Sequence, residues 1–230
     1  MNVNVIPAIF LTLVFVLTKV DNGVTHQQKV TTKNKTIATA APANKKVSTK
    51  KTFQTSKKIT QTQLDEDTES IYSFITGKFK KITDQDAKEI TENLINYGKK
   101  YNLDPKIAAA VIARESGFQK KAVSHTGAKG LGQIKDFNFK SLQITDPYNI
   151  NQNINGTVKY LKEMIENWNK EPKKNITTTK PPETEHEKVK LALASYYKGF
   201  TGVKKTGVDK KTEAYIDDIL DYYNEISREN

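Results

Sequence analysis

A glutamate on the apolar side of a predicted helix is the residue of this sequence best placed to do chemistry. The helix is expected to begin with Asp104 as its N-cap and Pro105 at its first position, and to end near Glu115. Residues seven, four and three positions before this glutamate share its helix face, and all are apolar: Ala108, Val111 and Ile112. Burial beside them, together with the negative end of the helix dipole, should raise the pKa of Glu115. A carboxyl that stays protonated near neutral pH can act as a general acid. The same sequence pattern would also fit a glutamate at the rim of the core whose carboxyl reaches water.

A glycine-rich segment follows twelve residues later. Gly127, Gly130 and Gly132 lie within six positions, which allows a sharp turn and close approach of a ligand to the backbone. Glycines alone would indicate only a turn between helices. A phosphate-binding loop is not expected, because no strand precedes the segment and no Lys-Ser/Thr pair closes it. Gln133 adds two donors and an acceptor that suit sugar hydroxyls or an acetamido group, or it is simply an exposed polar residue.

A third segment, residues 193–199, closes another predicted helix. Small residues before Tyr196 permit close helix packing, and Gly199 is a natural terminator. The pattern has two interpretations, which are compatible with each other. The segment packs in the core, and the Tyr196 hydroxyl donates a hydrogen bond to Glu115.

The positions of apolar residues predict the helices that carry these segments. Spacings of three and four indicate helices at 67–81, 84–101, 104–116, 152–168, 187–197 and 212–226. The polar, proline-containing stretch 169–185 is expected to be a long surface loop. Because no strand or hairpin pattern is found, residues 64–230 are predicted to form one all-α domain.

The first 63 residues differ from the rest in composition. Residues 1–20 contain an apolar run that suits a signal peptide or an uncleaved membrane anchor. Residues 21–63 are rich in Lys and Thr and should form a disordered linker, because they cannot bury enough apolar surface to offset the entropy of ordering.

The net charge of +11 belongs mainly to this linker. Residues 21–63 hold nine lysines and one aspartate, whereas residues 64–230 carry a net charge of only +2. A specific nucleic-acid partner is therefore not expected, because such proteins place a basic patch on a folded face. The linker could instead associate with an anionic wall polymer or a membrane surface. No cysteine is present and the three histidines are far apart, so neither a disulfide nor a metal site is expected.

Four motifs in order resemble the catalytic domain of lytic transglycosylases, the family of soluble lytic transglycosylases and goose-type lysozymes. That family shows Glu-Ser after an apolar helix, then Gly-Leu-Met-Gln, then Ala-Tyr-Asn-Ala-Gly, then a late tyrosine. The matching positions here are Glu115-Ser116, 130–133, 195–199 and Tyr215, and 146–150 is also family-like. Departures from the pattern include Gly132, which replaces Met, and Tyr197 and Lys198, which replace Asn-Ala. The resemblance covers roughly residues 88–224.

The resemblance implies a lysozyme-like helical domain with a substrate groove. Its substrate would be the glycan strand of peptidoglycan, cleaved between N-acetylmuramic acid and N-acetylglucosamine with formation of a 1,6-anhydro ring. Glu115 would act first as general acid and then as base. Four residues would bind the substrate: Ser124, Gln133, Tyr196 and Tyr215. Ser124 and Gln133 would hold the sugar near the scissile bond, and Tyr196 would also hydrogen-bond Glu115. The resemblance further implies no metal or cofactor, a monomer, and export to the cell envelope.

Three alternatives remain open from the sequence. A hydrolytic muramidase of goose-lysozyme type would need a second carboxylate, for which Asp136 and Asp146 are candidates. A non-catalytic module could keep the fold to bind glycan, although the intact Glu115 disfavours this. Polyanion binding by the lysine-rich linker could also be the main function.

Overall fold

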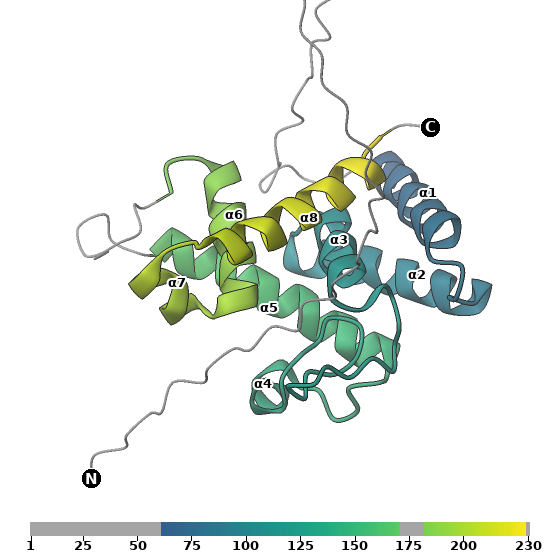
Figure 1. The fold of residues 1–230 in the computed structure, drawn as a ribbon. Helices are drawn as coiled ribbons and strands as arrows, with labels where there is room; N and C mark the ends of the chain where they lie inside the picture. The colour runs from purple at the N-terminus through teal and green to yellow at the C-terminus, as the bar shows by residue number, and fades with distance from the viewer. Residues whose placement is uncertain (1–60, 171–181, 229–230) are drawn as a thin grey trace, which may run out of the picture. The chain divides into compact units, whose positions relative to one another are not determined.

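The computed structural model describes residues 61–170 and 182–228, which form eight α-helices (Figure 1). The helices are α1 Gln61–Lys78, α2 Asp84–Tyr101, α3 Pro105–Ser116, α4 Asp136–Leu142, α5 Ile150–Lys170, α6 Glu185–Lys198, α7 Phe200–Thr206 and α8 Lys210–Ile226. Within these ranges no strand forms, and the extended backbone is limited to isolated bridges of Lys129 with Val123 and Ile134. The predicted all-α class is confirmed.

The predicted helices occur, with differences at their ends. Helix α1 begins six residues earlier than expected and ends at Lys78, so Phe79 follows it. Helix α5 continues to Lys170 and α6 begins at Glu185, which shortens the predicted loop; residues 171–181 lie outside the described residues. The seven-residue helices α4 and α7 were not predicted, because two turns show too little apolar periodicity. The apolar run and linker at residues 1–60 also lie outside the described residues.

Side-chain caps explain where several helices begin. Thr83 accepts a hydrogen bond from the Asp86 backbone N–H, and Asp104 accepts one from that of Lys106. Thr184 forms a full capping box with Glu187, and Asp209 caps α8. Each cap satisfies an amide that has no partner inside its helix. The cap predicted at Asp104 is thus confirmed.

Helix α3 is the central helix of the domain. It packs against α8, α2, α1 and α5, and α8 runs across it in Figure 1. Nine of its residues are buried, and four of these are alanines: Ala108, Ala109, Ala110 and Ala113. Alanine has a small side chain and the highest helix propensity, so this sequence forms a stable helix that neighbours can approach closely.

Helices α5 and α6 are joined by the single tryptophan. Trp168 is buried, and its indole Nε1 donates to the Ser195 hydroxyl at 2.9 Å and the Leu191 carbonyl at 3.1 Å. A buried indole N–H needs such partners, so the contact fixes α6 against α5.

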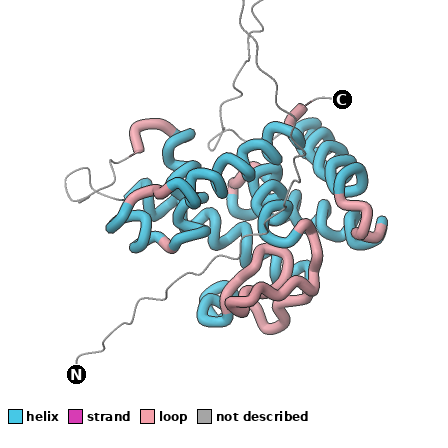
Figure 2. Tube along the Cα trace, viewed as in Figure 1, coloured by secondary structure: helices cyan, strands magenta, loops and turns pink. Residues whose placement is uncertain are grey.

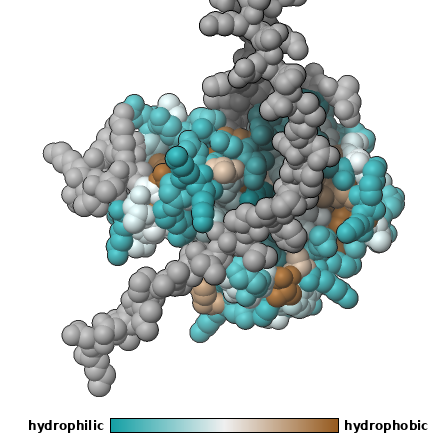
Figure 3. All heavy atoms as spheres, in the orientation of Figure 1, coloured by the Kyte–Doolittle hydropathy of each residue, from teal (hydrophilic) through white to brown (hydrophobic). Residues whose placement is uncertain are grey.

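The surface in view in Figure 3 is mostly hydrophilic, with small separate hydrophobic areas. Four large apolar or aromatic side chains stand exposed among the described residues: Val123, Phe137, Tyr148 and Val208. None of the described helices is both long enough and apolar enough to cross a membrane.

Enlarging a central alanine of α3 should disturb the packing around it. Ala109→Leu is expected to lower the free energy of unfolding by about 1–3 kcal/mol, because the site is fully buried and has no room for the added atoms. Ala214→Leu, on the exposed side of α8, is the matched control and should change stability by less than about 0.5 kcal/mol. Urea unfolding of both variants measures the difference; equal values would contradict the tight packing of α3.

Candidate active site

Glu115 lies in the last turn of α3 and is half-buried. The helix ends immediately after it, because Gly117 adopts a left-handed conformation (φ 55°) and its N–H bonds to the Ala113 carbonyl. Phe118 then enters an aromatic cluster, with its ring centroid 5.0 Å from that of Phe79. Ser116 donates to the Ile112 carbonyl, which fits a structural role. The carboxyl is therefore held at a fixed, well-packed helix end.

Tyr215 of α8 is the hydrogen-bond partner of this carboxyl. Its hydroxyl donates to Glu115 Oε1 at 2.6 Å, and the tyrosine is itself buried. Burial raises the pKa of Tyr215 well above its usual value, and the nearby Glu115 adds to this rise. The hydroxyl therefore stays protonated and remains a donor at any physiological pH.

The pKa of Glu115 is raised to about 7. Desolvation by burial is the main cause, and it is opposed by the hydrogen bond from Tyr215 and the positive charge of Arg114. Arg114 is held in place by an ion pair with Asp218, whose carboxylate lies 2.7 Å from the guanidinium Nε. The expected rise in the pKa of Glu115 is thus present, and the carboxyl can be protonated or ionised near neutral pH.

Tyr196 does not make the hydrogen bond to Glu115 that was predicted for it. Its hydroxyl donates to the Gly132 carbonyl at 2.7 Å, so it joins α6 to the glycine-rich segment. Tyr215 holds Glu115 instead. The sequence indicated that a tyrosine would contact the acid, but spacing along the chain could not distinguish between two tyrosines on different helices.

Asn153 of α5 holds the glycine-rich segment in place. Its Oδ1 accepts from the Gly132 N–H at 2.8 Å, and its Nδ2 donates to the carbonyls of Lys129 and Pro147. A Cβ added at Gly130, where φ is 76°, would lie 2.2 Å from this amide. Glycine is required at position 130 because φ is positive there and because a Cβ would clash with Asn153. No sequence motif marked Asn153, because it lies twenty residues beyond the segment that it supports.

The two residues predicted to hold the sugar lie at the end of this segment and just before it. The Gln133 amide Nε2 donates to the carbonyls of Ala122 and Gly130, which leaves its Oε1 for an external donor. The Ser124 hydroxyl accepts from the Ala128 N–H at 3.0 Å and lies 3.1 Å from the Thr126 hydroxyl. Both side chains shape the loop, and their contact with a sugar stays a prediction.

The departures at Gly132, Tyr197 and Lys198 each make specific contacts in the structure. A Cβ at Gly132 would lie 1.9 Å from the Thr157 hydroxyl and 2.9 Å from that of Tyr196, so the space of a side chain is filled from α5 and α6. Lys198 pairs with Asp209, the cap of α8, at 2.8 Å. The Tyr197 ring stacks on that of Tyr215, with centroids 4.7 Å apart and an interplanar angle of 23°.

The acidic candidates for a second catalytic carboxylate have other partners. Asp136 forms an ion pair with Lys129 at 2.8 Å, and Asp146 accepts from the Tyr148 N–H at 2.9 Å. Asp136 is the first residue of α4, and Asp146 lies between α4 and α5. Many of the loops of the domain gather in this region (Figure 2). The described residues contain no cluster of His, Cys, Asp or Glu that could hold a metal ion.

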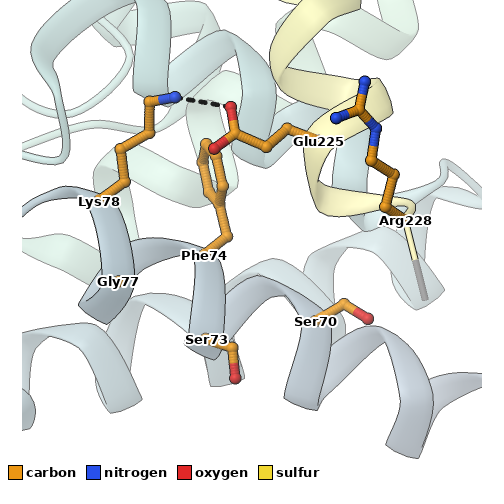
Figure 4. Close-up of a pocket in the computed structure, with 7 residues that line it drawn as sticks. All are labelled: Ser70, Ser73, Phe74, Gly77, Lys78, Glu225 and Arg228. Atoms are coloured by element: carbon orange, nitrogen blue, oxygen red, sulfur yellow. Dashed lines mark hydrogen bonds and ion pairs between the residues drawn. The ribbon is translucent and has the colours of Figure 1, made fainter. Parts of the chain in front are cut away.

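A surface pocket between α1 and α8 lies away from Glu115. Its lining includes Phe74, Lys78, Glu225 and Arg228, with Lys78 and Glu225 paired at 2.6 Å (Figure 4). Glu225 is ten residues beyond Tyr215 on α8, which places it roughly 15 Å along the helix from the acid's partner. The pocket is therefore separate from the candidate active site.

Comparison with known proteins identifies relatives of this arrangement. The sequence profile described as "Transglycosylase SLT domain" matches residues 92–219. The chain is 38% identical over 68 residues to a transglycosylase of Enterobacteria phage PRD1, a match that covers 30% of this chain and 26% of that protein.

Two bacterial relatives carry the same kind of name. The membrane-bound lytic murein transglycosylase F of Salmonella arizonae is 30% identical over 127 residues, covering 54% of this chain and 22% of the relative. The protein of that name from Vibrio parahaemolyticus is 33% identical over 99 residues, covering 42% of this chain and 16% of the relative. The chain thus matches about a quarter or less of the length of these relatives.

Removing the amide of Asn153 should destabilise the glycine-rich segment. Asn153→Ala leaves a buried N–H and two carbonyls without this partner, and a loss of roughly 2–4 kcal/mol in the free energy of unfolding is expected. Hydrogen exchange at the Gly132 amide should accelerate. Asn167→Ala, a half-buried position of the same helix, is the control and should change neither quantity appreciably. Unchanged exchange at Gly132 in Asn153→Ala would contradict the assignment.

The raised pKa of Glu115 should make the protein less stable as pH rises. Between its ordinary pKa of 4.5 and about 7, the unfolded chain releases this proton before the folded one, so stability falls over that window and then levels off. Each pKa unit is worth about 1.4 kcal/mol, so Glu115→Gln should stabilise the protein by up to roughly 3 kcal/mol at pH 8. At pH 4 the two proteins should be equally stable. Urea unfolding at both pH values measures this, and a pH-independent difference would argue against a raised pKa.

Proposed function

The chain belongs to the family of transglycosylase SLT domains, and from this premise we propose that it is a peptidoglycan lytic transglycosylase. The observation that carries the proposal is a single carboxyl, Glu115, whose pKa is raised to about 7 and whose position is fixed by Tyr215. The bond cleaved is the β-1,4 bond between N-acetylmuramic acid and N-acetylglucosamine.

In the first step Glu115 acts as a general acid. Its proton passes to the glycosidic oxygen as the bond from that oxygen to C1 of the muramic residue breaks. A pKa near 7 suits this step, because a large fraction of the carboxyl is protonated at neutral pH. The carboxylate left behind is stabilised by the Tyr215 hydroxyl and the charge of Arg114, the two contacts that lower the pKa of Glu115.

In the second step the same carboxylate acts as a base. It takes the proton of the C6 hydroxyl of the muramic residue, and the C6 oxygen closes onto C1 to give the 1,6-anhydro ring. Glu115 is then protonated again and ready for another cycle. The product contains no added water, and the reaction needs no metal, cofactor or second carboxylate.

The charges around Glu115 support one acid rather than two. A retaining or inverting hydrolase pairs two carboxyls at about 5–9.5 Å, and a second carboxylate that close would raise the pKa of the first. Within the described part of the chain, Arg114 is the one charged side chain that perturbs the pKa of Glu115. The glycine-rich segment would supply sugar contacts through Gln133 and Ser124, beside the loop backbone fixed by Asn153.

The setting of the reaction follows from its substrate. Peptidoglycan lies in the cell envelope, so we infer export, with residues 1–20 as a signal or anchor and residues 21–63 as a basic tether. The two bacterial relatives are named as membrane-bound, which supports this location.

Product analysis tests the proposal. Purified peptidoglycan digested with the full chain should release muropeptides with 1,6-anhydromuramic ends, each lighter by one water than the hydrolytic product in mass spectrometry. Glu115→Gln should reduce release by about a thousandfold or more, because no other group supplies the proton. Glu92→Gln, an exposed glutamate of α2, is the matched control and should leave release unchanged.

Each other outcome has a defined meaning. Reducing muramic ends would identify a hydrolase and overturn the transglycosylase proposal. Binding without release by the wild-type chain would indicate a glycan-binding module. Unchanged release by Glu115→Gln would overturn the assignment of the catalytic residue.

A further inference from the structure

The last turn of α6 reaches three different parts of the site through three consecutive side chains. Tyr196 bonds to the glycine-rich segment, Tyr197 stacks on Tyr215, and Lys198 pairs with the cap of α8. Successive residues of a helix point about 100° apart, so one short turn can contact a loop, a neighbouring helix and that helix's N-terminus together. Of the three, Tyr197 is the residue whose partner, Tyr215, hydrogen-bonds Glu115.

Tyr197 stacks on the ring of Tyr215, and the hydroxyl of Tyr215 is hydrogen-bonded to Glu115. The two rings lie nearly parallel, with centroids 4.7 Å apart, and the Tyr215 hydroxyl is 2.6 Å from the Glu115 carboxyl. Arg114 lies 5.5 Å from the centroid of the Tyr215 ring. The Tyr215 ring is thus packed by side chains from both α6 and α3, and movement of this ring would change the length of the hydrogen bond to the acid.

The hydroxyl of Tyr197 adds nothing to this contact. The ring is half-buried, and among the residues that the structure describes its hydroxyl has no hydrogen-bond partner. The contribution of Tyr197 is therefore the flat face of its ring. Asparagine, which the resemblance places at this position, has no such face to stack on Tyr215.

We propose that Tyr197 is a positioning residue, which keeps the Tyr215 hydroxyl on Glu115 by stacking on the Tyr215 ring. It acts through Tyr215 and touches neither the acid nor the bond that breaks. The inference rests on the proposed function only for its kinetic consequences, because the stack and the hydrogen bond also exist without substrate.

The groups that face Glu115 determine the direction of the expected change. Tyr215 from α8 and Arg114 from α3 both lower the pKa of Glu115, and Tyr196 from α6 is a neutral phenol. Weakening the Tyr215 hydrogen bond removes one of the two stabilising contacts of the carboxylate. The pKa of Glu115 should then rise further above 7.

The experiment compares Tyr197→Asn, Tyr197→Phe, Tyr215→Phe and the double variant Tyr197→Asn/Tyr215→Phe in the full chain. The pKa of Glu115 is followed by NMR with ¹³C-labelled glutamate carboxyls, assigned with Glu115→Gln, and kcat and KM are measured on soluble glycan strands. Tyr197→Asn should raise the pKa of Glu115 in the same direction as Tyr215→Phe. It should lower kcat on the order of tenfold, through misplacement of the acid, with KM unchanged. Tyr197→Phe should behave as wild type.

The double variant separates positioning from general packing. If Tyr197 acts through the hydrogen bond, adding Tyr197→Asn to Tyr215→Phe should cause no further change in the pKa or in kcat. Equal effects in both backgrounds would overturn the proposal, as would a raised KM with kcat and the pKa unchanged, which would make Tyr197 a sugar contact. If Tyr197→Asn does not fold, Tyr197→Leu keeps the bulk without the aromatic face and should show the same changes; wild-type behaviour of this variant would overturn the proposal.

The two proposals fail in different ways. If Glu115→Gln leaves glycan cleavage unchanged, the proposed function falls, while the NMR titration still tests the effect of Tyr197 on the carboxyl. If Glu115→Gln abolishes cleavage but Tyr197→Asn moves neither the pKa nor kcat, only the role of Tyr197 falls.

Discussion

The partial burial of one carboxyl, that of Glu115, is the constraint on which this structure depends. Desolvation raises the pKa of Glu115, which stands in the last turn of a helix that is buried for most of its length. The alanines of α3 let its neighbours approach closely, and Tyr215 reaches the acid from α8. Desolvation of the Glu115 carboxyl is unfavourable for folding, and the packing of the hydrophobic core offsets this cost.

The sequence was most informative where its signals are local. The cap at Asp104, the apolar face of α3 and the raised pKa of Glu115 all depend on residues within a few positions of one another. The all-α class followed from helical spacing and from the lack of a strand or hairpin pattern. The short helices α4 and α7 have too few turns to show that spacing, and helix ends depend on contacts that a periodic pattern does not contain.

The candidate site could be predicted as a set of residues but not as a set of contacts. Glu115 and Tyr215 are a hundred positions apart, and only the packing of α8 on α3 decides that Tyr215 rather than Tyr196 bonds to the acid. The role of Asn153 could not be predicted for a similar reason, because its three hydrogen bonds join α5 to two separate loops. Side-chain amides and phenols serve many structural roles, so residue type alone does not reveal which of them support a site.

The contact between Gly132 and Thr157 has a consequence for how this sequence can change. The volume that a side chain at position 132 would occupy is already taken by residues of α5 and α6, so restoring the larger residue of the family pattern would force its first carbon into the Thr157 hydroxyl. A larger residue at position 132 would need a smaller side chain at position 157 and a different position for the Tyr196 hydroxyl. Position 132 is therefore coupled by packing to positions 157 and 196, and overpacking would destabilise a protein that changes position 132 alone.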